Sequence, residues 1–182
     1  MRRVCLALVL CLCAGVSTKA RAGASLWLDV PFIRQVTDGC GAASLAMVMK
    51  YWEKQSGRTA SSNSDPGQIQ HALYSRRAHG IYASEMQQYL RQNGFRVFTF
   101  SGTWDDLRQH LGKGRPLIVA VKTPSRDLHY VVVAGIDDEQ HSVIVNDPAR
   151  RKLLNYDRTE FERDWSATDH WTLLAVPHDR VP

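Results

Sequence analysis

The chain has few cysteines, and most of them stand near its start. Three of the four, Cys5, Cys11 and Cys13, precede residue 22, so Cys40 is the only cysteine in residues 23–182. A framework of disulfide bonds within that part of the chain is therefore excluded. A cysteine left alone in this way is an inert buried side chain, half of an intermolecular link or a reactive thiol.

The sequence also has no apolar run of the roughly 20 residues that a membrane-spanning helix needs. The apolar stretch from Val4 to Val16 is shorter, follows two arginines and precedes an A-x-A pattern at residues 20–22. That arrangement is typical of a secretory signal peptide, and a permanent membrane anchor is the alternative. We therefore expect residues 1–22 to be a signal peptide and residues 23–182 to form one secreted or periplasmic domain without stable membrane insertion.

Strong charge of one sign and metal-binding motifs are missing as well. The formal charge is +5, but residues 1–22 hold four basic residues and no acidic one, which leaves +1 for the remainder. A nearly neutral domain gives no reason to expect a nucleic-acid partner. None of the seven histidines stands in an H-E-x-x-H or similar spacing, so we expect no metal and no cofactor.

The hydrophobic pattern changes its period between the two halves of the chain. Helical spacing, with capping residues at Asp65, Ser84 and Thr103, predicts helices over residues 40–54, 65–76, 84–94, 103–112 and 157–165. β-Branched and aromatic runs predict strands at Phe95–Phe100, Leu117–Val121, Tyr130–Ile136, Ser142–Val145 and Trp171–Val176. Polar residues 137–140 predict a hairpin between the third and fourth strands. Helices that largely precede strands predict an α+β fold with an antiparallel sheet.

The chemistry of the chain centres on Cys40, which opens the main predicted helix between Gly39 and Gly41. Free backbone N–H groups and the helix dipole at such a position stabilise a thiolate, and the two glycines leave it accessible. A thiol nucleophile also needs an imidazole base, a group that orients the base and donors for an oxyanion. Gln35 lies just upstream and can supply an amide N–H as a donor.

The base and its partner are expected on the sheet. His129 stands at the head of the strongest predicted strand, and Asp147 ends the next one. If the two strands form a hairpin, both side chains lie at the same end and the carboxylate fixes the imidazole tautomer. We expect surface or capping roles for the other histidines. The basic run Arg150–Lys152 is interpreted as solvated surface, with contact to an acidic substrate or partner as the alternative.

Three segments, Gln35–Met47, His129–Val133 and Asn146–Pro148, together resemble the bacteriocin-processing, double-glycine leader peptidases. These enzymes are papain-like cysteine peptidases, and the resemblance spans about residues 29–176. It implies a helical half that faces an antiparallel sheet, with the active site in the cleft between them.

The resemblance implies a role for each candidate residue: Cys40 is the nucleophile, His129 the base, Asp147 the group that orients the base and Gln35 the oxyanion donor. Many members of the family are cytosolic domains fused to an ABC transporter, whereas this chain carries its own signal. We therefore expect a secreted cysteine peptidase whose peptide or protein substrate lies outside the cytoplasmic membrane. Gly-Gly-type sites are the candidate specificity, and a secretion system is a candidate partner.

Two other classes of function stay open. The same thioester intermediate can be captured by an amine, which would make the protein an acyltransferase or transpeptidase. A non-catalytic module that keeps the fold and binds peptides is the third hypothesis, and the presence of Cys40 argues against it.

Overall fold

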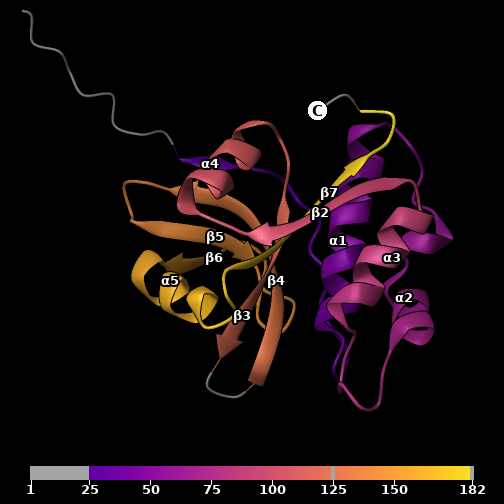
Figure 1. Ribbon diagram of the computed structural model, residues 1–182. Coiled ribbons are helices and arrows are strands. Elements are labelled where there is room, and N and C mark those ends of the chain that lie inside the picture. The colour runs from indigo at the N-terminus through magenta and orange to yellow at the C-terminus, as the bar shows by residue number, and fades with distance from the viewer. Residues whose placement is uncertain (1–24, 124–125, 181–182) are drawn as a thin grey trace, which may run out of the picture.

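The computed structural model describes residues 25–123 and 126–180. The predicted signal peptide, residues 1–22, lies outside the described residues. Within the described part, five α-helices pack on an antiparallel sheet of seven strands, which confirms the predicted α+β class (Figure 1).

The helices are α1 (Cys40–Gln55), α2 (Pro66–Leu73), α3 (Ala83–Gln92), α4 (Trp104–Gly112) and α5 (Arg158–Ser166), with a short 3-10 helix, η1 (Ser62–Ser64). The strands are β1 (Leu26–Trp27), β2 (Phe95–Ser101), β3 (Leu117–Thr123), β4 (Arg126–Asp137), β5 (Ser142–Asn146), β6 (Leu154–Asp157) and β7 (Trp171–Pro177).

The sheet runs in the order β2-β7-β3-β4-β5-β6, and β1 pairs with β4 beside this path. The hairpin predicted around residues 137–140 is confirmed, because β4 and β5 pair in antiparallel register from Val132↔Asn146 to Asp137↔Ser142. This pairing carries Asn146 and the residues that follow it to the part of the sheet from which β4 starts.

The two faces of the sheet cover two separate cores. One face packs on α1, whose residues from Cys40 to Met49 are all buried. Val132 of β4 belongs to this core, while Val133 belongs to the core on the opposite face, as alternation along a strand requires. Leu107 of α4 and Phe161 of α5 fill that second core. Figure 1 shows α1, α2 and α3 together on one side, and α4 and α5 beyond the sheet.

Two hydrogen bonds fix α1 against the sheet at separate points. The hydroxyl of Ser44 donates to the carbonyl of Tyr130 in β4 at 3.3 Å. The indole N–H of Trp52 donates to the carbonyl of Ala175 in β7 at 2.9 Å, and the bond is buried. Each donor is satisfied where water is excluded, so the first turns of α1 have a fixed position relative to β4.

Capping accounts for some helix starts and fails at another. Asp65 and Thr103 cap α2 and α4 as predicted, each accepting a backbone N–H. The cap predicted at Ser84 is wrong, because α3 begins one residue earlier, after Tyr82, and no side chain caps it. Helix α2 also ends sooner than predicted, since Tyr74 adopts extended backbone.

The sheet departs from the prediction in two places. Strand β6 was not predicted, because its polar residues at positions 155 and 157 interrupt the apolar pattern, yet it pairs with β5 along its length. His129 lies within β4 rather than at its head, since the β3–β4 ladder continues past the pair Val121↔His129 to Thr123↔Arg126.

Candidate active site

Cys40 is the first residue of α1, as predicted, and only 8% of its surface is exposed. The chain reaches it through a tight turn in which the N–H of Gly39 donates to the carbonyl of Val36 at 3.0 Å. A Cβ at position 39 would stand 3.0 Å from that same carbonyl oxygen, so glycine allows the turn to close. Cys40 therefore lies at the N-terminal end of α1, where the free N–H groups of the first turn favour negative charge.

His129 and Asp147 form a buried pair. The Nε2–H of His129 donates to Oδ1 of Asp147 at 2.8 Å, and the two residues are 2% and 6% exposed. The backbone N–H of Ala149 donates to the same carboxylate oxygen at 2.9 Å. Because both bonds hold one oxygen, the carboxylate and the imidazole keep a fixed orientation.

The second ring nitrogen of His129 is the one available to Cys40. Nδ1 is buried and has no oxygen or nitrogen partner among the described residues, while His129 also forms a hydrogen bond with Cys40. Since Nε2 is occupied by Asp147, Nδ1 is the atom left for the sulfur. The structure thus brings three of the four predicted residues into one chain of contacts, Cys40, His129 and Asp147.

The surroundings of His129 favour its charged form. Burial lowers the pKa of His129, but the hydrogen bonds with Asp147 and Cys40, together with the charges of these two groups, outweigh burial and raise the pKa from 6.5 to about 9. A ring with this pKa holds a proton at neutral pH. An imidazolium between a carboxylate and a sulfur is the arrangement that a thiolate nucleophile needs.

The pKa of Asp147 moves in the direction that keeps the carboxylate charged. Burial would raise this pKa, but the hydrogen bond and the charge of His129, the N–H of Ala149 and the charge of Arg150 together hold it below the usual range. The pair is therefore a charged one, an anionic carboxylate beside a cationic ring.

Gln35, the predicted oxyanion donor, is placed by the loop that follows Asp147. Its backbone N–H donates to the carbonyl of Pro148 at 3.0 Å. The preceding residue adds a second tie, because the guanidinium of Arg34 donates to the carbonyl of Arg150 at 3.0 Å. These two bonds hold the segment before Cys40 against the loop that follows Asp147.

Two residues that sequence reasoning did not single out support the site. The amide of Asn146 donates to the carbonyl of Val30 at 3.1 Å and accepts the N–H of Leu153 at 2.9 Å, which fixes both ends of the loop that holds Asp147. Burial and the charge of Cys40 raise the pKa of Tyr130, which belongs to the same buried cluster as Cys40 and therefore stays uncharged at neutral pH. The position of Asn146 directly before Asp147 is a signal that could have indicated its role.

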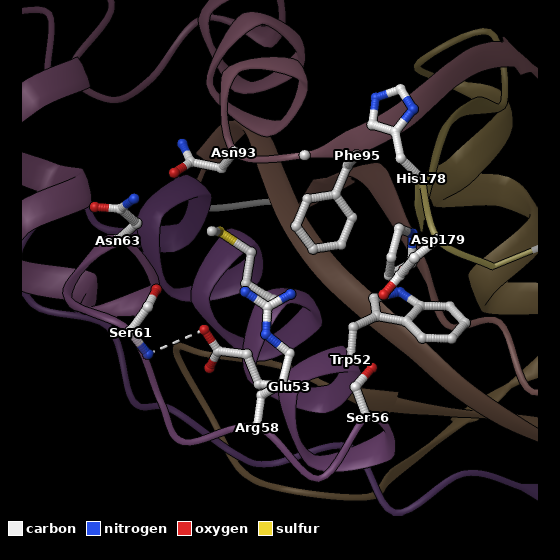
Figure 2. A pocket seen from close by; sticks show the side chains of 13 residues that line it. Trp52, Glu53, Ser56, Arg58, Ser61, Asn63, Asn93, Phe95, His178 and Asp179 are labelled. Atoms are coloured by element: carbon white, nitrogen blue, oxygen red, sulfur yellow. Dashed lines mark hydrogen bonds between the residues drawn. The ribbon is translucent and has the colours of Figure 1, made fainter.

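A pocket of about 380 Å³ lies at the opposite end of α1 and is lined by Trp52, Arg58, Phe95 and Asp179, among others. Figure 2 shows the side chain of Arg58 reaching from the turn after α1 into this space. At about 1.5 Å per residue, the helix carries Trp52 about 18 Å away from Cys40. The pocket is therefore separate from the cysteine site.

Within residues 25–123 and 126–180, no group of three His, Cys, Asp or Glu side chains could hold a metal ion. No helix there is long and apolar enough to cross a membrane.

A cysteine at a helix start, joined through a buried histidine to an aspartate on a facing antiparallel sheet, is the arrangement found in papain-like thiol peptidases. The chain belongs to the Peptidase_C39 like family, whose model matches residues 27–172. This confirms the resemblance to the bacteriocin-processing peptidases, and family membership supports a peptidase. No curated protein matches the chain by sequence.

Several solved structures share the fold. A putative C39-like peptidase from Bacillus anthracis is 19% identical, with a TM-score of 0.66 over 87% of this chain and 100% of that one. The peptidase domain of Streptococcus ComA, a bifunctional ABC transporter of a quorum sensing pathway, is 22% identical, with a TM-score of 0.62 over 80% and 97%. A double-glycine motif protease from an AMS/PCAT transporter, in complex with its leader peptide, is 24% identical, with a TM-score of 0.61 over 83% and 94%.

Proposed function

We propose that this protein is a cysteine peptidase that acts on a peptide or protein outside the cytoplasmic membrane. The observation that carries the proposal is the position of His129, which is buried between Cys40 and Asp147 and bonded to both. Residues 2–22 have the pattern of a signal peptide, which supports a location in the periplasm or beyond it.

The proposed reaction begins with attack of the Cys40 thiolate on the scissile carbonyl, which forms a carbon–sulfur bond. The oxyanion accepts hydrogen bonds from the backbone N–H of Cys40 and the side-chain amide of Gln35. His129 then donates its proton to the nitrogen of the leaving amine, and the carbon–nitrogen bond breaks. Water, deprotonated by His129, attacks the thioester and releases the acid and the thiolate.

The substrate class follows from the family. One solved relative of the same fold holds a leader peptide, which supports a peptide that lies extended across the cysteine. We include cleavage after a Gly-Gly pair and delivery of the peptide by a secretion system in the proposal, because relatives of this fold include a double-glycine protease from a transporter.

A digest of a defined peptide library tests the proposal. The wild-type protein should cut a subset of peptides, and Cys40→Ala should cut none of them. Addition of an excess of a nucleophilic amine distinguishes hydrolysis from acyl transfer, since a transferase would attach the amine to the new carboxyl end. If neither product forms in any peptide, the catalytic proposal is overturned and the peptide-binding module remains.

Labelling with iodoacetamide tests the same proposal without a substrate. Cys40 should react rapidly well below pH 8, because His129⁺ holds its partner as a thiolate. His129→Ala should restore the profile of an ordinary thiol, whose rate rises with pH. An ordinary profile in the wild-type protein would speak for a binding module with an inactive thiol.

A further inference from the structure

The loop that follows Asp147 carries several basic side chains, and hydrogen bonds hold its backbone in place. The N–H of Asp147 donates to the carbonyl of Arg151 at 3.2 Å, and the N–H of Arg150 donates to the carbonyl of Asp147 at 2.9 Å. The guanidinium of Arg34 donates to the carbonyl of Arg150. Three arginines are therefore gathered directly beside the residue that orients the base.

The guanidinium groups of Arg150 and Arg151 are not neutralised. Both side chains are exposed, and neither makes a hydrogen bond or an ion pair with a described residue. Their neighbour Lys152 differs, because it forms an ion pair with Asp29 at 2.8 Å, and Asp29 is shared with Lys54. The same basic run thus contains a cation with a partner and two cations without one.

A second basic loop packs against the residue two positions before the nucleophile. The N–H of Ser75 donates to the carbonyl of Gly80 at 2.8 Å and closes a short turn over residues 75–80. The turn docks on Asp38, which accepts the hydroxyl of Tyr74 at 3.3 Å and lies 3.9 Å from Nδ1 of His79.

The tip of this second loop carries Arg76 and Arg77. Both side chains are exposed, and neither side chain makes a hydrogen bond or an ion pair with a described residue. The two loops hold opposite ends of one segment, since Gln35 bonds to the first loop and Asp38 to the second. The segment that leads to Cys40 therefore lies between them.

The carboxylates that contact these loops do not offset the charge. Asp147 is buried against His129. Asp38 faces Tyr74 and His79, and Asp29 is held by two lysines. Like charges fixed near one another repel, and an anionic ligand that lies between them relieves the repulsion. The charge of Arg150 already reaches the site, because it contributes to the low pKa of Asp147.

We propose that these two loops, residues 75–80 and 148–151, form a cationic rim that binds acidic side chains on both sides of the scissile bond of the substrate. The inference rests on the proposed peptidase function and names its substrate class as an acidic peptide. It also changes the interpretation of the basic run, in which Arg150 and Arg151 contact substrate while Lys152 is structural.

The geometry limits where the acidic residues stand. Gln35 and Asp38 are three residues apart, so the two loops begin within about 10 Å of each other along the chain. An extended peptide advances about 3.3 Å per residue, and an arginine side chain reaches several ångströms further. Acidic residues are therefore expected within about four positions of the scissile bond.

The first experiment compares matched substrates and matched variants. A peptide cleaved in the library digest is made in two forms, with Glu or with Gln at positions near the cut. For wild-type protein, KM should be about tenfold lower for the Glu form, with kcat nearly equal, because the rim contacts are made equally before and during the reaction. Near 1 M salt, where the screening length falls to about 3 Å, the difference should vanish.

The variants then assign the effect to the rim. Arg150→Gln/Arg151→Gln should raise KM for the Glu form about tenfold relative to KM for the Gln form, because any effect of the Arg150 charge on Asp147 is common to both peptides. Lys152→Gln removes a charge from the same loop at a position that is already paired, and should change KM less than about twofold. Equal effects of both variants, or no preference for Glu in the wild-type protein, would overturn the proposal.

A binding assay tests the cationic rim independently of the proposed peptidase function. Cys40→Ala protein is titrated with the same Glu and Gln peptides carrying a fluorophore, and polarisation is measured at low and high salt. Tighter, salt-sensitive binding of the Glu peptide would uphold the rim even if the wild-type protein cleaved nothing. If the wild-type protein cleaved a peptide but Cys40→Ala bound both peptides equally, the cationic rim would be contradicted and the proposed peptidase function would stand.

Discussion

The two ends of helix α1 differ in burial: the first turn lies in a buried site, and the last turn borders a pocket that is open to solvent. At the first turn, Cys40, His129 and Asp147 are almost wholly buried, and each reactive group is held by the next. At the last turn, a pocket of about 380 Å³ opens to solvent, and the side chain of Arg58 extends into it without an ion pair or a side-chain hydrogen bond to a described residue (Figure 2).

The two ends show that the presence of a pocket and the presence of aligned reactive groups are separate properties in this molecule. The pocket has volume and polar groups, but no described contact aligns a nucleophile with a base there. The cysteine end has an imidazole whose pKa is raised to about 9 by two specific neighbours. The proposal of a catalytic site at the cysteine end therefore rests on burial and mutual orientation of groups rather than on the size of a cavity.

The largest expected effect is a loss of kcat from substitutions at the cysteine end of α1, with no such loss from a substitution at the pocket end. Cys40→Ala and His129→Ala should each lower kcat by at least about 10⁴-fold, because each removes a group that forms or breaks bonds. Arg58→Ala at the far end should leave kcat within about twofold. Steady-state hydrolysis of a peptide identified by the library digest measures all three, and circular dichroism checks that the variants fold.

A smaller loss should follow when only the orientation of the base is weakened. Asp147→Asn keeps the shape of the side chain but removes its charge, and the hydrogen bond with Asp147 is the largest single contribution that raises the pKa of His129. We expect kcat to fall about 10²-fold less than in His129→Ala, since the nucleophile and base remain. A loss as large as that of His129→Ala would mean that Asp147 acts directly in the reaction.

The pH dependence sharpens the contrast further. The folded-state pKa of His129, about 9, lies above its ordinary value of 6.5. Its contribution to folding stability is therefore fully present below pH 6.5 and is lost as pH rises to about 9. The melting temperature of the wild-type protein should fall across this window more than that of His129→Gln, and kcat should decline near pH 9 as the ring loses the proton needed by the leaving amine.

The smallest expected effect belongs to the pocket end and concerns stability alone. Trp52→Phe removes the bond from the indole N–H to the carbonyl of Ala175 and should lower the free energy of unfolding by about 1–2 kcal/mol. Trp27→Phe on the half-exposed strand β1 is the matched control, with a change below about 0.5 kcal/mol. Urea unfolding measures both, and any change in kcat would contradict the independence of the two ends.

The sequence pattern predicted those elements whose formation depends on neighbouring residues. The helix that begins at Cys40 follows from glycines and helix formers around it, and the β4–β5 hairpin follows from a polar turn between apolar runs. The Ser84 cap failed because the packing of Met86 and Leu90 sets the helix start more strongly than one side-chain bond does. Strand β6 was missed because pairing with β5, and not its own composition, makes it a strand.

The candidate site could be predicted as residue types but not as an environment. Cys40, His129 and Asp147 stand at positions that one mechanism requires, and the structure brings them together. Their burial, the shift in the pKa of His129 and the docking of Gln35 on Pro148 arise from contacts distant in sequence. The assignment of catalytic roles stays a prediction, and the variants above test it.

The ties between the start and the end of the domain have a consequence for when activity can arise. Val30 and Asn146 bond across 116 positions of sequence, and Gln35 meets Pro148 over a similar separation. Such contacts form late, because loop closure opposes them until the intervening chain is ordered. During synthesis Cys40 leaves the ribosome before residues 146–148 are made, so a nascent or truncated chain that ends before residue 146 lacks the contacts on which the proposed activity depends.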